Sequence, residues 1–269
     1  TCIVTGGNSG LGLATAHALA DRGATVWLLG RNTDRSKVAV SALQKETGNA
    51  NIHHAKLDLA DPESIATLSA RLPVSTVDVL VNNAGVLVDE HHTNTVGLET
   101  TVATNLIGHF ALTAALLPHL RRGSNARVIW VSSGGMYAKK LNVDELFDPP
   151  TPFDGVMAYA QSKRAMATIS ERLAAELAPD GIAVHCMHPG WAATPGVEKS
   201  LPRFWQVTKP ILRTPESGAD TITWLAVCDR AATTPGLFWF DRKPRSLHLF
   251  PNTKHSEDEA SKLWSEEHR

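Results

Sequence analysis

Two side chains that could exchange a proton stand four positions apart in the stretch YAQSK. Tyr159 and Lys163 lie at i and i+4, so a helix would project both from one face. An ammonium group beside a phenol favours the phenolate and lowers the phenol pKa from about 10 toward the range that proton transfer needs. The chain's other tyrosine, Tyr137, has Leu141 at the same spacing. Standing alone, the pair would indicate a surface tyrosine beside a routine lysine, so its context decides.

A cluster of glycines follows the first apolar run of the chain. In TGGNSGLG, the residues Gly6, Gly10 and Gly12 stand between a β-branched stretch and an amphipathic helical pattern. A dinucleotide pyrophosphate needs a tight turn, a bare backbone and helix N–H groups that point at it, and glycines at a strand-to-helix junction supply all three. Any tight strand–helix turn also favours glycine. The position at the first strand favours the nucleotide site.

The end of the second apolar run indicates which dinucleotide binds. A chain that prefers NAD usually has an acidic residue here for the ribose 2′-hydroxyl. Gly30 stands in that place, and Arg31 and Arg35 follow it. Guanidinium groups suit a 2′-phosphate because they form charge-assisted, bidentate hydrogen bonds. The pattern predicts NADP(H) in preference to NAD(H), and the alternative is two solvated arginines on a loop.

Two further polar features lie in apolar surroundings. VIWVSSGGM ends a buried strand with Ser132 and Ser133, at the sheet edge where a hydroxyl can enter a ligand crevice. Asn105 stands inside the helical stretch LETTVATNLIGHFALTAALL. A core asparagine must find partners, because leaving it without them costs about 1 to 3 kcal/mol.

The elements that must position these residues alternate along the chain. Short apolar, β-branched runs are separated by amphipathic segments, which predicts a single α/β domain over residues 1–269. We expect a doubly wound, Rossmann-type parallel sheet of about seven strands with helices on both faces. Residues 138–156 form an insertion before the Tyr159 helix, and residues 195–217 are predicted to be a substrate lid. The charged segment 242–269 is expected to lie on the surface or fray.

As a set, the motifs resemble those of the short-chain dehydrogenase/reductase family. The glycine loop, NNAG at 82–85, the serine pair, YxxxK at 159–163 and PGxxxT at 189–194 occur in the family's order over nearly the whole chain. The resemblance implies that Tyr159 exchanges the proton and that Ser133 binds the substrate oxygen, with Ser132 as the structural neighbour whose hydroxyl caps the turn. It also implies that Lys163 lowers the phenol pKa and holds the nicotinamide ribose, while Asn105 keeps a water bridged to that lysine.

The resemblance further implies a set of cofactor contacts. Asp58 should meet the adenine, and Thr194 should bond the nicotinamide carboxamide. The full set consists of Thr5, Gly6, Asn8, Ser9, Gly10, Leu11, Gly12, Arg31, Arg35, Asp58, Leu59, Asn82, Asn83, Ala84, Gly85, Tyr159, Lys163, Pro189, Gly190 and Thr194.

One departure from the family pattern concerns spacing. Twenty-six positions separate Ser133 from Tyr159, roughly twice the family's interval, because residues 138–156 intervene. This puts in doubt the family's usual pairing of subunits through the helices of Asn105 and Tyr159. The expectation is a monomer or a homodimer.

The amino-acid composition limits the kinds of partner that we expect for this chain. Lys plus Arg number 26 against 27 Asp plus Glu, so no charge excess favours nucleic acid or an anionic membrane. The three cysteines are widely spaced, and His53-His54 and His91-His92 lack further ligands at metal spacing, so we expect no metal site. No apolar run approaches the roughly 18 residues of a membrane span. We expect a cytoplasmic location, and, since the chain starts inside an apolar run, residues upstream of it.

These features together predict an NADP(H)-dependent enzyme that interconverts a small-molecule carbonyl compound and its alcohol. Aromatic and sulfur side chains expected at the pocket favour an apolar substrate, namely Met136, Tyr137, Phe153, Trp191, Phe204 and Trp205. Equally, Phe204 and Trp205 could anchor an amphipathic helix. Two other functions remain open: a cofactor-sensing binding protein without turnover, and an epimerase or dehydratase of nucleotide sugars, which commonly has a longer chain.

Overall fold

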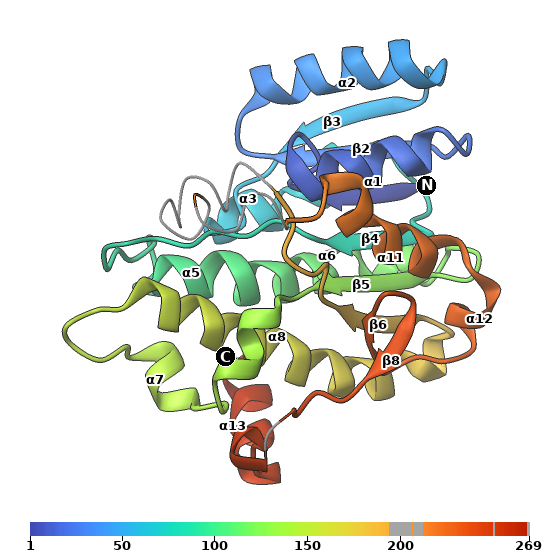
Figure 1. The fold of residues 1–269 in the computed structure, drawn as a ribbon. Coiled ribbons are helices and arrows are strands. Elements are labelled where there is room, and N and C mark those ends of the chain that lie inside the picture. The colour runs from blue at the N-terminus through green and yellow to red at the C-terminus, as the bar shows by residue number, and fades with distance from the viewer. Residues whose placement is uncertain (194–205, 207–211, 250, 268–269) are drawn as a thin grey trace.

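The computed structural model describes residues 1–193, 206, 212–249 and 251–267, and in them a single sheet carries helices on both faces (Figure 1). Its strand order is β3-β2-β1-β4-β5-β6-β7-β8. The strands are β1 (Cys2–Thr5), β2 (Val26–Gly30), β3 (Ile52–Lys56), β4 (Val79–Asn82), β5 (Arg127–Val131), β6 (Ala183–Met187), β7 (Phe238–Phe240) and β8 (Lys243–Arg245). All neighbours pair in parallel except β8, which is antiparallel to β7. The predicted Rossmann-type fold is confirmed, with eight strands where about seven were expected.

The helices form two layers around this sheet. They are α1 (Gly10–Ala20), α2 (Thr33–Thr47), α3 (Pro62–Ala66), α4 (Leu68–Arg71), α5 (Thr100–Val102), α6 (Gly108–Leu120), α7 (Val143–Phe147), α8 (Gly155–Leu177), α11 (Pro215–Val227), α12 (Asp229–Ala232) and α13 (Glu257–Glu267). Buried residues of α1, α2, α11 and α12 share one core, and those of α3, α4, α6, α7, α8 and α13 share the other. Each face of the sheet is therefore covered.

The strands contribute alternate residues to the two cores. In β1, Ile3 belongs to one core, whereas Cys2 and Val4 belong to the other. This alternation follows from the two-residue period of a strand. Because both faces are buried, the strands need apolar residues at successive positions, which is why they read as continuous apolar runs in the sequence.

The segment after β7 is folded onto the domain. β8 completes a hairpin with β7, and α13 packs on α8 and α7. Leu263 of α13 is fully buried, and the Trp264 ring meets the Phe110 ring of α6 edge-on, with centroids 6.0 Å apart. From the sequence, a charged surface segment that could fray is expected here. Glu257 and Asp258 are exposed, but Ala260 and Leu263 stand three positions apart and give the helix a buried side.

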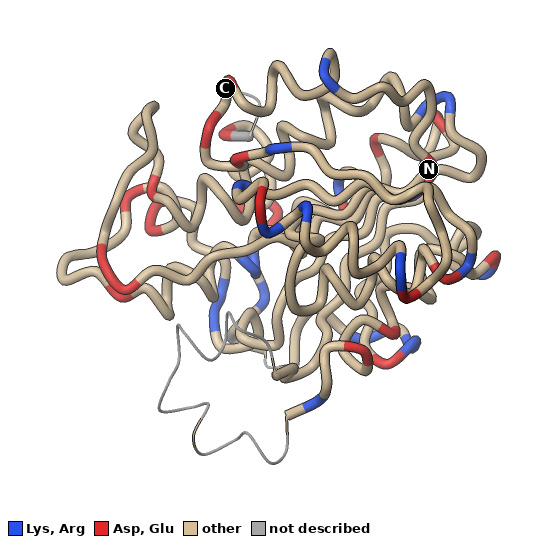
Figure 2. The backbone as a smooth tube through the Cα atoms, turned by 90° about the horizontal axis from the view of Figure 1, so that it is seen from above, with Lys and Arg blue, Asp and Glu red and all other residues tan. Residues whose placement is uncertain are grey.

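One helical stretch, Thr100–Leu120, is long and apolar enough to meet the length and composition of a membrane span. In this fold 61% of its apolar window is buried, and Leu106, Leu112 and Leu116 belong to the core beneath the sheet. A core helix passes the same test. Along the described backbone, Lys and Arg positions are interspersed with Asp and Glu positions (Figure 2).

Candidate active site

A pocket of about 340 Å³ opens at the carboxyl ends of β1 to β4. Its lining contains most of the cofactor contacts that the resemblance implies: Thr5, Gly6, Asn8, Ser9, Gly10, Leu11, Arg31, Arg35, Asp58, Leu59, Asn83, Ala84 and Gly85. Parallel sheets of this type bind their ligands at this edge. The residues that the sequence scatters over eighty positions thus share one cavity.

The glycine loop leaves helix N–H groups available to a phosphate. Gly6 has a φ of 64° and Gly10 a φ of 51°, a region that suits glycine. A Cβ on Gly12 would stand 2.3 Å from the Gly6 carbonyl oxygen, so no side chain fits there. Ser9 precedes α1 without a side-chain capping hydrogen bond, and the first turn has no acidic residue. The helices α2, α8 and α11, in contrast, have side-chain caps. An uncapped helix start in a glycine cradle fits a dinucleotide pyrophosphate.

The pocket end nearest α2 is cationic. Arg31 and Arg35 line it and are exposed, and in the described part of the chain neither guanidinium has a hydrogen bond or ion pair. The Asn8 side chain donates to the Ser36 hydroxyl at 2.9 Å. A Cβ on Gly30 would lie 3.0 Å from the Asn8 amide nitrogen, so an acidic side chain at position 30 would displace Asn8. The arrangement suits a 2′-phosphate better than a bare ribose hydroxyl.

Helix α8 brings the two residues of YAQSK together. The Lys163 ammonium nitrogen lies 5.6 Å from the centre of the Tyr159 ring and donates to the Val131 carbonyl of β5 at 2.9 Å. Ser133 follows β5, and its hydroxyl accepts the Gly135 N–H at 3.2 Å. The Ser133 and Tyr159 hydroxyls are hydrogen-bonded to each other. Residues twenty-six positions apart thus meet in spite of the insertion between them.

Burial controls the ionisation of this group. Burial raises the pKa of Tyr159, and the hydrogen bond with Ser133 opposes that shift. Burial also lowers the pKa of Lys163 to about 8. From the sequence, Lys163 is expected to lower the phenol pKa; in the structure burial raises that pKa, and the effect that opposes burial comes from Ser133. Tyr159 is consequently protonated at neutral pH.

Asn105 lies in a π-helical turn, η1 (Ala103–Ile107), between α5 and α6. Its side-chain oxygen accepts the Val86 N–H at 2.8 Å, and its nitrogen donates to the Val86 carbonyl at 3.0 Å and to the Ser162 hydroxyl at 3.1 Å. A Cβ on Gly85 would stand 3.4 Å from both the Asn105 side-chain oxygen and the Lys163 nitrogen. Asn105 and Lys163 therefore flank a space that Gly85 keeps bare. The water-bridging role of Asn105 stays a prediction.

Two predicted residues lie differently from expectation, and a third falls in a part of the chain that the structure does not describe. Asn82 is buried and donates to the Thr113 hydroxyl at 3.0 Å, so it faces the core and does not line the pocket. Ser132 donates to the Lys163 carbonyl at 2.7 Å instead of capping a turn. Thr194 lies outside the described residues, as do Phe204, Trp205 and most of the predicted lid.

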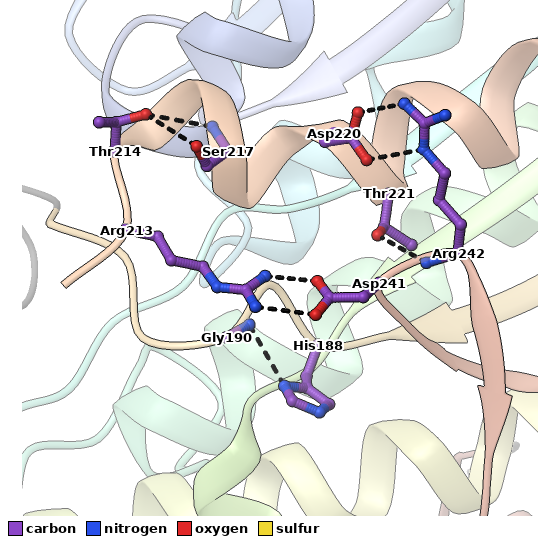
Figure 3. Close-up of polar contacts among 9 residues, drawn as sticks. All are labelled: His188, Gly190, Arg213, Thr214, Ser217, Asp220, Thr221, Asp241 and Arg242. Carbon is purple, nitrogen blue, oxygen red and sulfur yellow. Dashed lines mark hydrogen bonds and ion pairs between the residues drawn. The ribbon is translucent and has the colours of Figure 1, made fainter. Parts of the chain in front are cut away.

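Pro189 and Gly190 follow β6, and the side chain of the distant Arg213 lies beside Gly190 (Figure 3). Gly190 has a φ of 75°, and a Cβ there would stand 3.1 Å from the Arg213 side chain. Arg213 makes a bidentate ion pair with Asp241. Nothing in the sequence marks this pair, because its partners are 28 positions apart and lie in no motif.

The surroundings of His188 are aromatic. Its ring stacks on Phe240, with centroids 4.2 Å apart and planes 8° apart, and its Nδ1 accepts the Gly190 N–H at 3.3 Å. Burial lowers its pKa to about 4. His188 is thus a packed residue at the strand end. Within the ranges that the structure describes, no three His, Cys, Asp or Glu side chains are placed to hold a metal ion.

The family of the chain follows from this fold, the pocket and a direct sequence match. The family model for short chain dehydrogenases matches residues 1–203, and the chain belongs to that family. Dehydrogenase/reductase SDR family member 12 of Bos taurus is 44% identical over 97% of this chain and 83% of its own length. Human retinol dehydrogenase 13 is 33% identical over 100% of this chain and 83% of its own length. A short-chain dehydrogenase of Escherichia coli CFT073, solved with NADPH, superposes with a TM-score of 0.73 at 26% identity, over 88% of this chain and 94% of that one.

Proposed function

We propose that this protein is an NADP(H)-dependent oxidoreductase that interconverts a ketone or aldehyde and the corresponding alcohol. The observation that carries the proposal is the convergence of Ser133, Tyr159 and Lys163 beside a glycine-lined pocket with an arginine-rich end. The NADPH bound to the Escherichia coli relative supports the choice of cofactor. Arg31 and Arg35, whose guanidinium groups have no hydrogen bond or ion pair with any residue that the structure describes, support it independently.

In this proposal the chain's own residues manage the proton. When the cofactor is bound, its nicotinamide supplies the hydride. The Ser133 hydroxyl holds the substrate oxygen by a hydrogen bond, and Tyr159, protonated because burial raises its pKa, donates the proton to that oxygen. The buried Lys163 ammonium stabilises the phenolate that remains, since an opposite charge nearby favours the ionised form.

Further residues of the site suit the cofactor's phosphate groups and its nicotinamide end. The uncapped start of α1 and the cradle of Gly6, Gly10 and Gly12 would hold the pyrophosphate, and Arg31 with Arg35 would hold the 2′-phosphate. Lys163 would hold the nicotinamide ribose. Thr194 is proposed to bond the nicotinamide carboxamide.

An apolar carbonyl compound is the proposed substrate class. Trp191 is 56% exposed and its indole nitrogen lies near Gly134, next to Ser133. Apolar side chains around a few convergent polar groups are typical of small-molecule sites. The similarity to a retinol dehydrogenase agrees with this class.

A panel assay tests the proposal. Purified protein and NADPH are mixed with short and long aldehydes, ketones, quinones, sterols and retinal, and the loss of NADPH absorbance is followed. We expect turnover of apolar carbonyl compounds, and slower turnover with NADH. Tight NADPH binding without turnover across the whole panel would contradict the proposal and favour a cofactor-sensing protein.

A further inference from the structure

His109 contacts residues of both the cofactor pocket and the proton-transfer group of the candidate site. It is the second residue of α6, four positions after Asn105, and its side chain is fully buried. Its Nδ1 lies 2.9 Å from the Asn105 carbonyl oxygen, and its Nε2 lies 3.0 Å from the Thr5 hydroxyl. Thr5 lines the dinucleotide pocket, whereas Asn105 lies beside Lys163. One imidazole therefore touches the cofactor side and the proton-transfer side.

The hydrogen bonds around Thr5 determine where the His109 proton sits. The Thr5 hydroxyl oxygen accepts the N–H groups of Asn83 and Ala84, both at 2.9 Å. A hydroxyl has two acceptor lone pairs and one donor hydrogen. It has no lone pair left for an Nε2–H, so it donates to Nε2; its other acceptor, the Val81 carbonyl, is farther away at 3.2 Å.

The contact of the other ring nitrogen, Nδ1, indicates the same tautomer of His109. A carbonyl oxygen can only accept, so the 2.9 Å contact with the Asn105 carbonyl requires a proton on Nδ1. Both partners thus select the neutral Nδ1–H tautomer. The Trp130 ring, edge-on with centroids 6.1 Å apart, packs against the imidazole.

We propose that His109, held as the Nδ1–H tautomer, is a positioning residue that fixes the Thr5–Asn83–Ala84 wall of the cofactor pocket and the Asn105 turn together. The proposal rests on the proposed function for its kinetic consequences. Its effect reaches Tyr159 through contacts: the Asn105 side chain bonds the Ser162 hydroxyl, which donates to the Tyr159 carbonyl at 2.8 Å.

His109 acts without transferring a proton. Both ring nitrogens have protein partners, and the residue is wholly enclosed. Burial, together with the smaller effect of the nearby Lys163 charge, lowers the pKa of His109 to about 3, although the hydrogen bond to the Asn105 carbonyl opposes that shift. A histidine that stays neutral near neutral pH is a fixed donor and acceptor, and we assign it no acid or base step.

Two conservative variants separate its two bonds. In His109→Asn the amide nitrogen stands near the place of Nδ1, so the bond to Asn105 is retained and the bond from Thr5 is lost. In His109→Gln the amide oxygen reaches the place of Nε2, so the Thr5 bond is retained and the Asn105 bond is lost. We expect the Asn variant to raise the NADPH Kd and KM, and the Gln variant to lower kcat, each roughly three- to tenfold, the effect of one neutral hydrogen bond.

His185 provides the matched control. It is also fully buried and neutral, and its Nδ1 accepts the Trp239 indole N–H at 3.2 Å, in β6 and away from the pocket. His185→Asn should lower the thermal midpoint and leave Kd, KM and kcat unchanged. If the two His109 variants changed Kd and kcat by the same factors as each other, or left both unchanged while folded, the positioning role would be refuted.

The decisive readout needs no turnover. The ¹⁵N shifts of the His109 ring, assigned by their loss in His109→Phe, report which nitrogen carries the proton. We expect a protonated Nδ1, a bare Nε2 and no titration between about pH 5 and 8. A protonated Nε2 would overturn the inference. If no carbonyl substrate is found, the proposed function fails, and the tautomer and the NADPH Kd of the Asn variant still decide this inference.

Discussion

The Lys163 ammonium nitrogen lies 5.6 Å from the centre of the Tyr159 ring, one turn along α8, and Lys163 is only 3% exposed. Among the residues that the structure describes, the Lys163 ammonium has one hydrogen-bond partner, the neutral Val131 carbonyl, and no carboxylate partner. Burying a charge in this way opposes folding. The buried Lys163 ammonium can therefore stabilise a Tyr159 phenolate, but its burial lowers the free energy of unfolding.

That cost should appear in the pH dependence of unfolding. The pKa of Lys163 is about 8 in the folded chain, against 10.5 for an ordinary lysine. Below pH 8 both states carry the proton and the full cost is present. Between pH 8 and 10.5 only the unfolded state binds the proton, so folded wild type gains stability as pH rises. Relative to Lys163→Met, we expect wild type to gain about 3 kcal/mol over this window, measured by urea unfolding.

The exposed Lys140 supplies the control for that experiment. The stability difference between wild type and Lys140→Met should stay flat over the same pH window. A flat difference for Lys163→Met as well would show that the lysine is not buried as a charge.

Arg31 should decide between the two dinucleotides. It lines the pocket without a partner of its own among the described residues, so a 2′-phosphate can use its donors fully. We expect Arg31→Ala to weaken NADPH binding roughly ten- to hundredfold, as for loss of a charge-assisted bond, and to leave NADH binding unchanged. Isothermal titration with both cofactors measures this. Arg230, in α12 on the opposite side of the sheet order, serves as the control; equal losses for both cofactors in Arg31→Ala would refute the assignment.

The chain should be a monomer in solution. Helices α7 and α13 pack against α8, and α13 also reaches α6 through the ring contact of Trp264 with Phe110. The family usually pairs its subunits through the helices that here carry Asn105 and Tyr159, namely η1 with α6, and α8. Because they are covered from within the chain, we expect a monomer mass by light scattering at micromolar concentration. A stable dimer whose interface includes α8 would contradict this.

Much of the fold could be predicted because it depends on local pattern. The strands are continuous apolar runs, and the glycine loop and Arg31 stand at strand ends, where parallel topology brings them to one edge. Tyr159 and Lys163 share a face by helical spacing alone.

The features that sequence reasoning missed depend on contacts between distant segments. One side of α13 is buried because it packs on α7 and α8, and Arg213 meets Asp241 only after the sheet has formed. The phenol pKa depends on how much solvent the fold removes, which no local motif records. The position of His109 in the site could not be predicted for the same reason, because an isolated histidine in an apolar helix does not indicate its contacts with Thr5 and Asn105.

The most direct test of the account compares the chain's two tyrosines. Tyr137 is the matched control, because its hydroxyl donates to the Ser246 carbonyl at 3.0 Å and takes no part in the proposed chemistry. We expect Tyr159→Phe to lose at least a hundredfold in kcat, in line with removal of a general acid, with NADPH binding and thermal midpoint retained. Tyr137→Phe should keep kcat. Full turnover by Tyr159→Phe on a substrate that wild type reduces would contradict the central claim.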